Sequence, residues 1–234
     1  MGFHRGPKVV TNGLVLALDA ANVKSYPGSG TTWRDLSGNN NTGTLTNGPT
    51  FNSANAGNIV FDGVDDFVSL GNFAASSLPN GSICSWVKLA SGGLTFQVIA
   101  AKRTGGDAAG FDYELDLSST GRNIRGLVSN GTSFNIITGT TTLSYGVWYS
   151  LVFTWNGSAL NVYLNGISDA TQVSQTISVS SSSTKPFDIG VGKEISIAQR
   201  YYKGNISGTL LYNRALSSSE IAQNYNALKS RFNL

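Results

Sequence analysis

Short runs in which apolar and polar residues alternate follow one another along most of the chain, and turn residues separate them. Alternation with a period of two, bounded by Gly, Asn and Ser, predicts β-strands rather than helices. The runs lie at 13–19, 59–70, 82–89, 96–101, 111–117, 147–155, 159–164 and 206–212. So many strands in a chain of 234 residues predict one all-β domain, a two-sheet antiparallel jelly-roll sandwich.

One short helix is predicted at the C-terminal end, over residues 218–230. Ser217 and Glu220 have the spacing of a capping box, which satisfies the first free backbone N–H groups of a helix. Helical spacing then places three apolar side chains on one face, those of Ile221, Tyr225 and Leu228. We expect this face to pack on the sandwich. The domain would then span residues 13–234, preceded by an N-terminal arm at 1–12.

Asn-Gly pairs mark several turns between the predicted strands. Asn156 and Gly157 separate two of the runs and predict a tight hairpin, because both residue types tolerate positive φ angles. Further Asn-Gly pairs lie at 47–48, 80–81, 130–131 and 165–166. Residues 61–67 also read as a hairpin, with three carboxylates crowded into its turn.

The composition narrows the classes of partner. Apolar residues make up 40% of the chain, which is enough for a core, whereas charged residues make up only 12%. The net charge of +3 comes from scattered Lys and Arg without a basic stripe, so nucleic-acid binding is disfavoured. No apolar run reaches the length of a membrane span, and no apolar region follows the polar first residues as in a secretory signal. The single cysteine, Cys84, is interpreted as a buried free thiol.

Four segments, taken together, resemble one known family. They are Gly-Leu-Val-Leu-Ala-Leu-Asp-Ala-Ala-Asn at 13–22, Trp-Arg-Asp-Leu-Ser-Gly-Asn at 33–39, Ile-Val-Phe-Asp-Gly-Val-Asp-Asp-Phe-Val at 59–68, and Leu-Tyr-Asn-Arg-Ala-Leu-Ser at 211–217. In this order they resemble the concanavalin A-like, laminin-G-like jelly rolls. The first two segments are also similar to structural proteins of tailed phages, especially phages of marine cyanobacteria.

The resemblance implies Ca²⁺ as the candidate cofactor, because family members often hold one ion at the rim of the sandwich. Ca²⁺ takes six to eight oxygen ligands from carboxylates, carbonyls and water. The residues that could supply them are Asp19, Asn22, Asp62, Asp65 and Asp66. The alternative is that these residues form turns and cap strands. The segment at 204–209 favours this alternative, since it lacks the carboxylate that members often carry there.

A second acidic group lies on the predicted strand 111–117. Asp112, Glu114 and Asp116 share one strand face because side chains alternate along a strand. The pattern is similar to the Glu-x-Asp-x-Glu strand of some glucanases in the superfamily, with the acidic types inverted. Retaining glycosidases need two carboxyl groups about 5 Å apart. We instead expect a solvated face, paired with Arg122 or Arg125 on the adjoining strand.

The aromatic residues do not single out a sugar site, so the carbohydrate-binding residues stay unknown at this stage. Five aromatics fall in loop-like segments: Tyr26, Trp33, Tyr145, Tyr201 and Tyr202. Trp86, Trp148 and Trp155 lie within predicted strands and are expected in the core.

The resemblance implies a non-enzymatic structural or decoration protein of a virion, made in the host cytoplasm, with a lectin-like jelly roll facing outward. Its partners would be other virion proteins and host-surface glycans, and neither nucleic acid nor membrane; an oligomer stays open. The predicted arm carries Phe3, His4, Arg5 and Lys8, which could anchor it on an acidic neighbour. The alternatives are a dedicated carbohydrate-binding adhesin of the tail-fibre type and a glycoside hydrolase.

Overall fold

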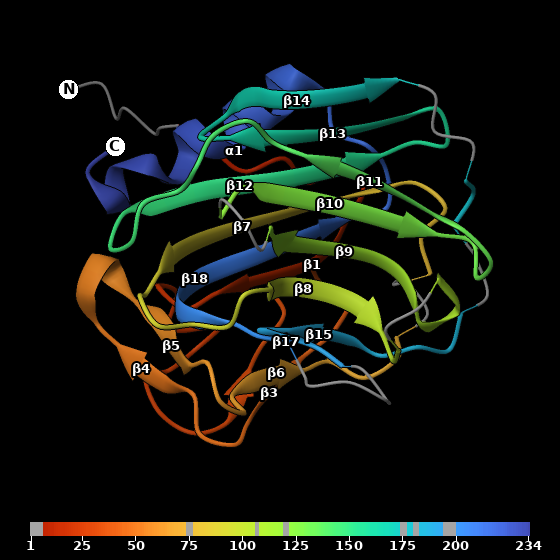
Figure 1. Ribbon diagram of the computed structural model, residues 1–234. Coiled ribbons are helices and arrows are strands. Elements are labelled where there is room, and N and C mark those ends of the chain that lie inside the picture. Colours follow the sequence, from red (N-terminus) through yellow and green to blue (C-terminus); the bar gives the residue numbers. More distant parts are fainter. Residues whose placement is uncertain are drawn as a thin grey trace.

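The computed structural model describes residues 7–73, 77–105, 108–118, 122–173, 177–179, 183–193 and 200–234. Over these residues the chain forms two antiparallel sheets stacked face to face, which confirms the predicted sandwich. Figure 1 shows the layer that contains β8, β9 and β10 in front of the layer that contains β7, β18 and β1. The helix α1 lies on the far side, behind the strands β12 and β13.

Sheet A has the strand order β14-β13-β12-β7-β18-β5-β4, and β1 pairs with β18 beside β5. Its strands are β1 (Leu14–Asp19), β4 (Thr50–Asn52), β5 (Asn58–Asp62), β7 (Gly81–Leu89), β12 (Trp148–Trp155), β13 (Ala159–Leu164), β14 (Ile167–Val173) and β18 (Lys203–Tyr212). The central strand β18, the last strand of the domain, therefore pairs with the first strand, β1.

Sheet B has the order β11-β10-β9-β8-β15-β6-β3-β2. Its strands are β2 (Thr32–Trp33), β3 (Gly43–Thr46), β6 (Phe67–Ser69), β8 (Gln97–Arg103), β9 (Phe111–Leu117), β10 (Ile124–Ser129), β11 (Phe134–Thr138) and β15 (Phe187–Ile189). A separate pair joins β16 (Val191–Gly192) to β17 (Arg200–Tyr201). Short 3₁₀ turns occupy Ala54–Ala56, Ala108–Gly110 and Lys229–Phe232.

The main core fills the space between the sheets. Tyr113, Leu115 and Leu117 of β9 point inward, and Tyr113 stacks on Trp155 of β12 with 4.7 Å between the ring centroids. Gly126 of β10 faces Phe153 so closely that an added Cβ would lie 2.0 Å from the ring. The two sheets can approach to this degree because glycine stands at the contact.

The predicted helix is present as α1 (Ser218–Leu228) and continues as a 3₁₀ turn instead of reaching residue 230 as α-helix. Both hydrogen bonds of the predicted capping box between Ser217 and Glu220 form. The helix packs on the outer face of sheet A, where Trp86 stacks on Tyr225 and on Phe232 of the 3₁₀ turn. Of the helices within the described residues, none is long and apolar enough to cross a membrane.

The second half of the predicted N-terminal arm packs against α1. The backbone N–H of buried Val10 donates to Asn224 Oδ1 at 2.7 Å, and the Tyr212 hydroxyl donates to the Val10 carbonyl at 2.9 Å. Gln223 donates to the carbonyl of Lys8 at 2.8 Å. The predicted arm is therefore tied to α1 from Lys8 onward, and the first strand, β1, begins at Leu14. Residues Phe3, His4 and Arg5 lie outside the described residues.

The predicted hairpin at 61–67 is wrong. β5, before this turn, belongs to sheet A, and β6, after it, belongs to sheet B, so the turn carries the chain from one sheet to the other. The carboxylates do crowd the turn as predicted: Asp66 Oδ2 accepts from the Asp62 N–H at 2.9 Å, and Asp62 Oδ1 accepts from the Val64 N–H at 2.8 Å. The local pattern predicts the turn correctly, but it does not show which strands β5 and β6 pair with.

Candidate functional site

The three carboxylates of β9 lie on the outer face of sheet B, as their alternation predicts, but they are not solvated. Tyr113 and Leu115 take the inward positions between them. Asp112 is 2% exposed, and Glu114 and Asp116 are both 0% exposed. The expectation of a solvated strand face is therefore wrong. A buried carboxylate requires a charged or hydrogen-bonding partner, because desolvation without one is costly.

Guanidinium groups pair with two of these carboxylates. Arg103 Nη1 donates to Glu114 Oε2, and Arg200 Nη1 lies 3.8 Å from Glu114 Oε1. Arg125 binds Asp116 in a bidentate manner, with Nε at 2.7 Å from Oδ1 and Nη2 donating to Oδ2. The fork of a guanidinium matches the two oxygens of a carboxylate, so these pairs fix the side-chain geometry.

The prediction that Arg122 or Arg125 pairs with this strand face is confirmed for Arg125. Arg125 pairs with Asp116, whereas Arg122 donates to the carbonyl of Leu143 at 2.8 Å. The guanidinium of Arg122 also lies over the ring of Tyr145, 4.6 Å from its centroid. Arg122 precedes β10 and is directed away from β9, which period-two alternation alone could not show.

Lysines pair with the remaining acids of this face. Lys185 Nζ lies 2.8 Å from Asp112 Oδ1, and Lys193 Nζ lies 2.8 Å from Asp188 Oδ2. Asp188 lies on β15, separated from β9 by β8. We refer to the four acid–base pairs Asp112–Lys185, Glu114–Arg103, Asp116–Arg125 and Asp188–Lys193 as the β9 charge network.

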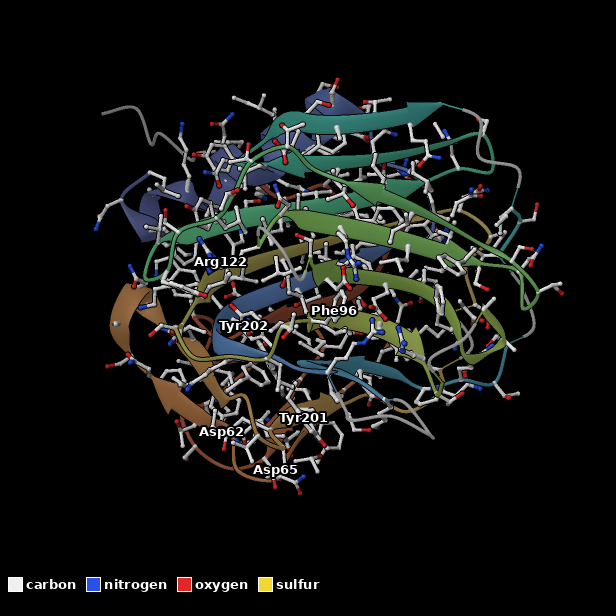
Figure 2. All side chains as sticks on the ribbon, in the orientation of Figure 1. Asp62, Asp65, Phe96, Arg122, Tyr201 and Tyr202 are labelled. Atoms are coloured by element: carbon white, nitrogen blue, oxygen red, sulfur yellow. The ribbon has the colours of Figure 1, made fainter. Side chains whose placement is uncertain are left out.

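Two aromatic rings hold cations of the β9 charge network in place. Phe96 contacts both Arg125 and Arg200, with 5.0 Å and 4.8 Å from ring centroid to guanidinium carbon. Lys193 Nζ lies 4.4 Å from the ring centroid of Phe67. Figure 2 shows Phe96 beside β8 and β9 on the near face of the molecule. Sequence reasoning missed Phe96, Lys185, Asp188 and Lys193, since long-range contacts carry no local signal.

Burial alters the acid–base chemistry of the β9 charge network. Desolvation raises the pKa of Asp116 to about 8. The hydrogen bond from Arg125 opposes this rise, and the charge of Glu114 adds to it. Asp112 Oδ2 is buried and has no hydrogen-bond partner in the described part of the chain. An unsatisfied buried acceptor costs about 1–3 kcal/mol, so a buried water at this atom would stabilise the face.

The rim turn carries the second acidic group, formed by Asp62, Asp65 and Asp66. Carboxylate oxygens of these residues lie within 4.8 Å of one another. Burial raises the pKa of Asp66, a hydrogen bond from the Asp62 backbone opposes this, and the charges of the other two carboxylates add to the rise. Figure 2 shows Asp62, Asp65 and Tyr201 together at one edge of the molecule. This oxygen-only cluster fits Ca²⁺ chemically, because a cation would offset the mutual repulsion.

The other two predicted calcium ligands do not join the rim turn. Arg231 binds both carboxylate oxygens of Asp19, at 2.8 and 3.0 Å, and Asn22 Oδ1 accepts from the Lys24 N–H at 3.0 Å. Asp19 lies opposite position 208 of β18 and Asp62 lies opposite position 203. Five strand positions correspond to about 17 Å. The predicted five-residue set is therefore split, and its first two members serve an ion pair and a turn.

Most of the aromatics expected in loops are buried. Tyr26, Trp33 and Tyr202 are between 0 and 3% exposed, Tyr201 is half-buried, and Tyr145 is 46% exposed. The side chains of Trp86, Trp148 and Trp155 are buried, as predicted. Tyr145 is thus the one exposed member of the loop set, and Arg122 lies over its ring.

A cavity of about 410 Å³ lies on the opposite side of the molecule, between α1, the N-terminal segment and the outer face of sheet A. Its lining is mostly apolar and includes Cys84, Trp86 and Phe232. Burial raises the pKa of the Cys84 thiol to about 12. The thiol is therefore protonated at neutral pH, which agrees with the predicted buried free cysteine.

Comparison with known families gives one match. The model Laminin_G_3, described as the concanavalin A-like lectin/glucanases superfamily, matches residues 62–222, more than half of the chain. No curated protein matches the sequence.

Solved structures show the same fold at low identity. Domain 4 of AbnA, a GH43 extracellular arabinanase from Geobacillus stearothermophilus solved with arabinotriose, has a TM-score of 0.69 and 18% identity, covering 91% of this chain and 98% of that domain. The binding domain of Paraclostridial Mosquitocidal Protein 1 gives 0.70 and 14%, covering 93% and 52%. The ligand binding domain of botulinum neurotoxin serotype D, solved with N-acetylneuraminic acid, gives 0.67 and 16%, covering 92% and 51%. The chain thus spans about half of each toxin domain.

Proposed function

The chain belongs to the concanavalin A-like lectin/glucanases superfamily, and we propose that it is a non-enzymatic virion structural or decoration protein. Its lectin-like jelly roll would face outward and contact glycans on the host surface. Two similar structures support the glycan part, since one was solved with arabinotriose and the other with N-acetylneuraminic acid. The virion part is supported by the resemblance of segments 13–22 and 33–39 to structural proteins of tailed phages.

The observation that carries the non-enzymatic proposal is the state of the β9 carboxylates. A retaining glycosidase requires one free carboxylate nucleophile and one free acid, both open to the sugar. Here Glu114 and Asp116 are fully buried and bound by arginines. Neither carboxylate has the open approach that attack on an anomeric carbon requires.

A glycan-binding screen with the purified protein tests the first part of the proposal. We expect binding to one or more oligosaccharides without release of reducing ends from the matching polysaccharide. An absence of binding to every glycan would contradict the proposal. Mass spectrometry and electron microscopy of purified particles test the virion part, which requires the chain in the particle at a fixed position.

A dedicated adhesin of the tail-fibre type is the first alternative. The glycan-binding screen and the location of the chain in the particle distinguish it from a decoration protein. An adhesin would bind one glycan tightly and lie at the tip of a fibre, whereas a decoration protein would cover a shell or tube. Microscopy of antibody-labelled particles therefore distinguishes the two functions.

A glycoside hydrolase is the second alternative, and one observation favours it. A carboxyl with a raised pKa beside a second carboxyl, as at Asp116 and Glu114, is one feature of a general acid and its partner. Cleavage of a polysaccharide that disappears in a Glu114→Gln variant shown to be folded would establish this function and overturn the non-enzymatic proposal.

A further inference from the structure

The geometry points to an anionic glycan, bearing a carboxylate or a sulfate ester, as the ligand of the β9 charge network. This inference rests on the proposed glycan binding and names its chemical class. In three of the four pairs, the acid is fully buried and the cation reaches further toward solvent; in the fourth, Glu114–Arg103, both members are buried. The side chains of Asp112, Asp116 and Asp188 are 0–3% exposed, whereas those of Arg125, Lys185 and Lys193 are 12%, 19% and 32% exposed.

Each of these three pairs therefore has its positive end toward solvent. A ligand above the face approaches the ammonium or guanidinium group first, and the carboxyl group lies deeper. Cations arranged in this way give a positive potential above the face, even where a pair carries no net charge. The face consequently favours an anion over a neutral sugar or a cation.

Three cations, Arg125, Lys185 and Lys193, have N–H donors that their acidic partners do not use. Arg125 uses Nε and Nη2 for Asp116, and its Nη1 has no partner within the described residues. Lys185 Nζ donates to Asp112 alone among the described residues, and Lys193 Nζ contacts Asp188 and the ring of Phe67. Bonds from charged donors to an anion are the stronger class of hydrogen bond.

The spacing suits an oligosaccharide rather than a single ion. Asp112 and Asp116 are four positions apart on β9, which corresponds to about 13 Å. Asp188 lies two strands away from β9, which corresponds to about 10 Å. Cations held over this area can contact two or three sugar units, and the exposed Phe134 on β11 extends the face with an aromatic ring.

Matched ligand pairs provide the test. The carboxylate arm compares 3′-sialyllactose with lactose, and the sulfate arm compares dextran sulfate with dextran, each titrated into the full chain by calorimetry. We expect at least one anionic member to bind and its neutral counterpart to bind at least tenfold more weakly. Lys185→Gln and Lys193→Gln should each lower the affinity about tenfold, the effect of one charge-assisted hydrogen bond.

Asp188→Asn separates a binding role from a structural one. It removes the buried charge and leaves Lys193 in place, so anion affinity should stay equal or rise. If the pair only supports the fold, Asp188→Asn and Lys193→Gln would weaken binding alike, which would overturn the inference. Should Lys193→Gln unfold, the double variant Asp188→Asn/Lys193→Gln removes both charges together and should show the same tenfold loss.

Lys24→Gln is the matched control, because Lys24 is exposed in a loop outside this face. It should bind like the unaltered protein, and an equal loss there would reveal non-specific attraction of a polyanion and overturn the inference. Tight binding of neutral glycans only would also overturn it while leaving the proposed function standing. If no glycan binds, both the inference and the proposed glycan binding are contradicted.

Discussion

Glu114 is the residue whose substitution best tests the buried charge network. Glu114→Gln removes the charge that faces Arg103, which is itself 2% exposed. Breaking a buried ion pair from one side is strongly destabilising, so we expect the free energy of unfolding to fall by about 3 kcal/mol. Urea denaturation measures this value. Asp65→Asn, on an exposed carboxylate, is the control and should change it by less than about 0.5 kcal/mol. Equal values for the two variants would contradict the buried pairing.

The sequence predicts which residues share a strand face but not how deeply that face is buried. Alternation correctly places Asp112, Glu114 and Asp116 together, because it depends only on local backbone geometry. Their burial depends on Lys185, which is 73 positions from Asp112, and on Arg103, 11 positions from Glu114. Such partners are set by sheet order, which no local pattern encodes.

The calcium prediction is tested at the rim turn. Added Ca²⁺ should raise the thermal midpoint, because an ion that binds only the folded state stabilises it by about 2.7 kcal/mol at a concentration of 100 Kd. Asp65→Asn should abolish the shift, since its carboxylate is part of the cluster. Asp19→Asn should retain it, because Asp19 binds Arg231 instead. If the thermal midpoint of the unaltered chain does not change when Ca²⁺ is added, the predicted calcium site is wrong.

At the scale of elements, the N-terminus of α1 gives a pH-dependent prediction. Hydrogen bonds from Arg214 and from the Ser217 backbone lower the pKa of Glu220 from 4.5 to about 2. A carboxyl whose pKa is lower in the folded state stabilises fully above its unfolded value and loses this effect as pH falls. Glu220→Gln should therefore be less stable than the unaltered chain above pH 4.5, with the difference vanishing toward pH 2. Denaturation across this range measures it, and a difference independent of pH would exclude the ion pair as its source.

The approach of the two sheets makes Gly126 a packing requirement. In Gly126→Ala the new methyl group would overlap Phe153, so β10 or the ring must shift. Overpacking of this kind costs about 1–3 kcal/mol, measured as the loss of unfolding free energy. Gly71→Asn is the comparison, because nothing lies within 4 Å of a Cβ there and its φ of +63° falls in the left-handed region that Asn tolerates. A smaller loss in Gly126→Ala than in Gly71→Asn would contradict the tight contact.

The elements themselves were largely predictable, and their pairing was not. The long strands β7, β9, β12, β13 and β18, the Asn156-Gly157 turn and the cap of α1 follow from local rules. The error at 61–67 arose because a sharp turn with Gly and Asp looks the same whether it joins neighbours in one sheet or crosses between sheets. Two- and three-residue strands such as β2 and β15 are too short to show alternation.

The whole molecule has two distinct outer faces. The N-terminal segment and α1 lie on sheet A, and the β9 charge network lies on sheet B, with the core between them. Figure 1 shows α1 on the far side of β12 and β13, behind the layer of β9 and β10. In the proposed virion protein, attachment through the first face would leave the second free for glycans.

Deletion of residues 1–6 tests this polarity. The hydrogen bonds of Lys8 and Val10 to α1 remain, so the truncated chain should keep its thermal midpoint. If Phe3, His4 and Arg5 anchor the protein on an acidic neighbour, incorporation into particles should fall severalfold or more, as measured by quantitative mass spectrometry.

The control is Lys193→Gln, on the opposite face. This variant should be incorporated normally, since the side chain of Lys193 lies on sheet B beside Asp188. Normal incorporation of the truncated chain would exclude the N-terminal residues as the anchor and direct attention to α1. Loss of incorporation in Lys193→Gln alone would instead place attachment on sheet B, where it would compete with glycan binding.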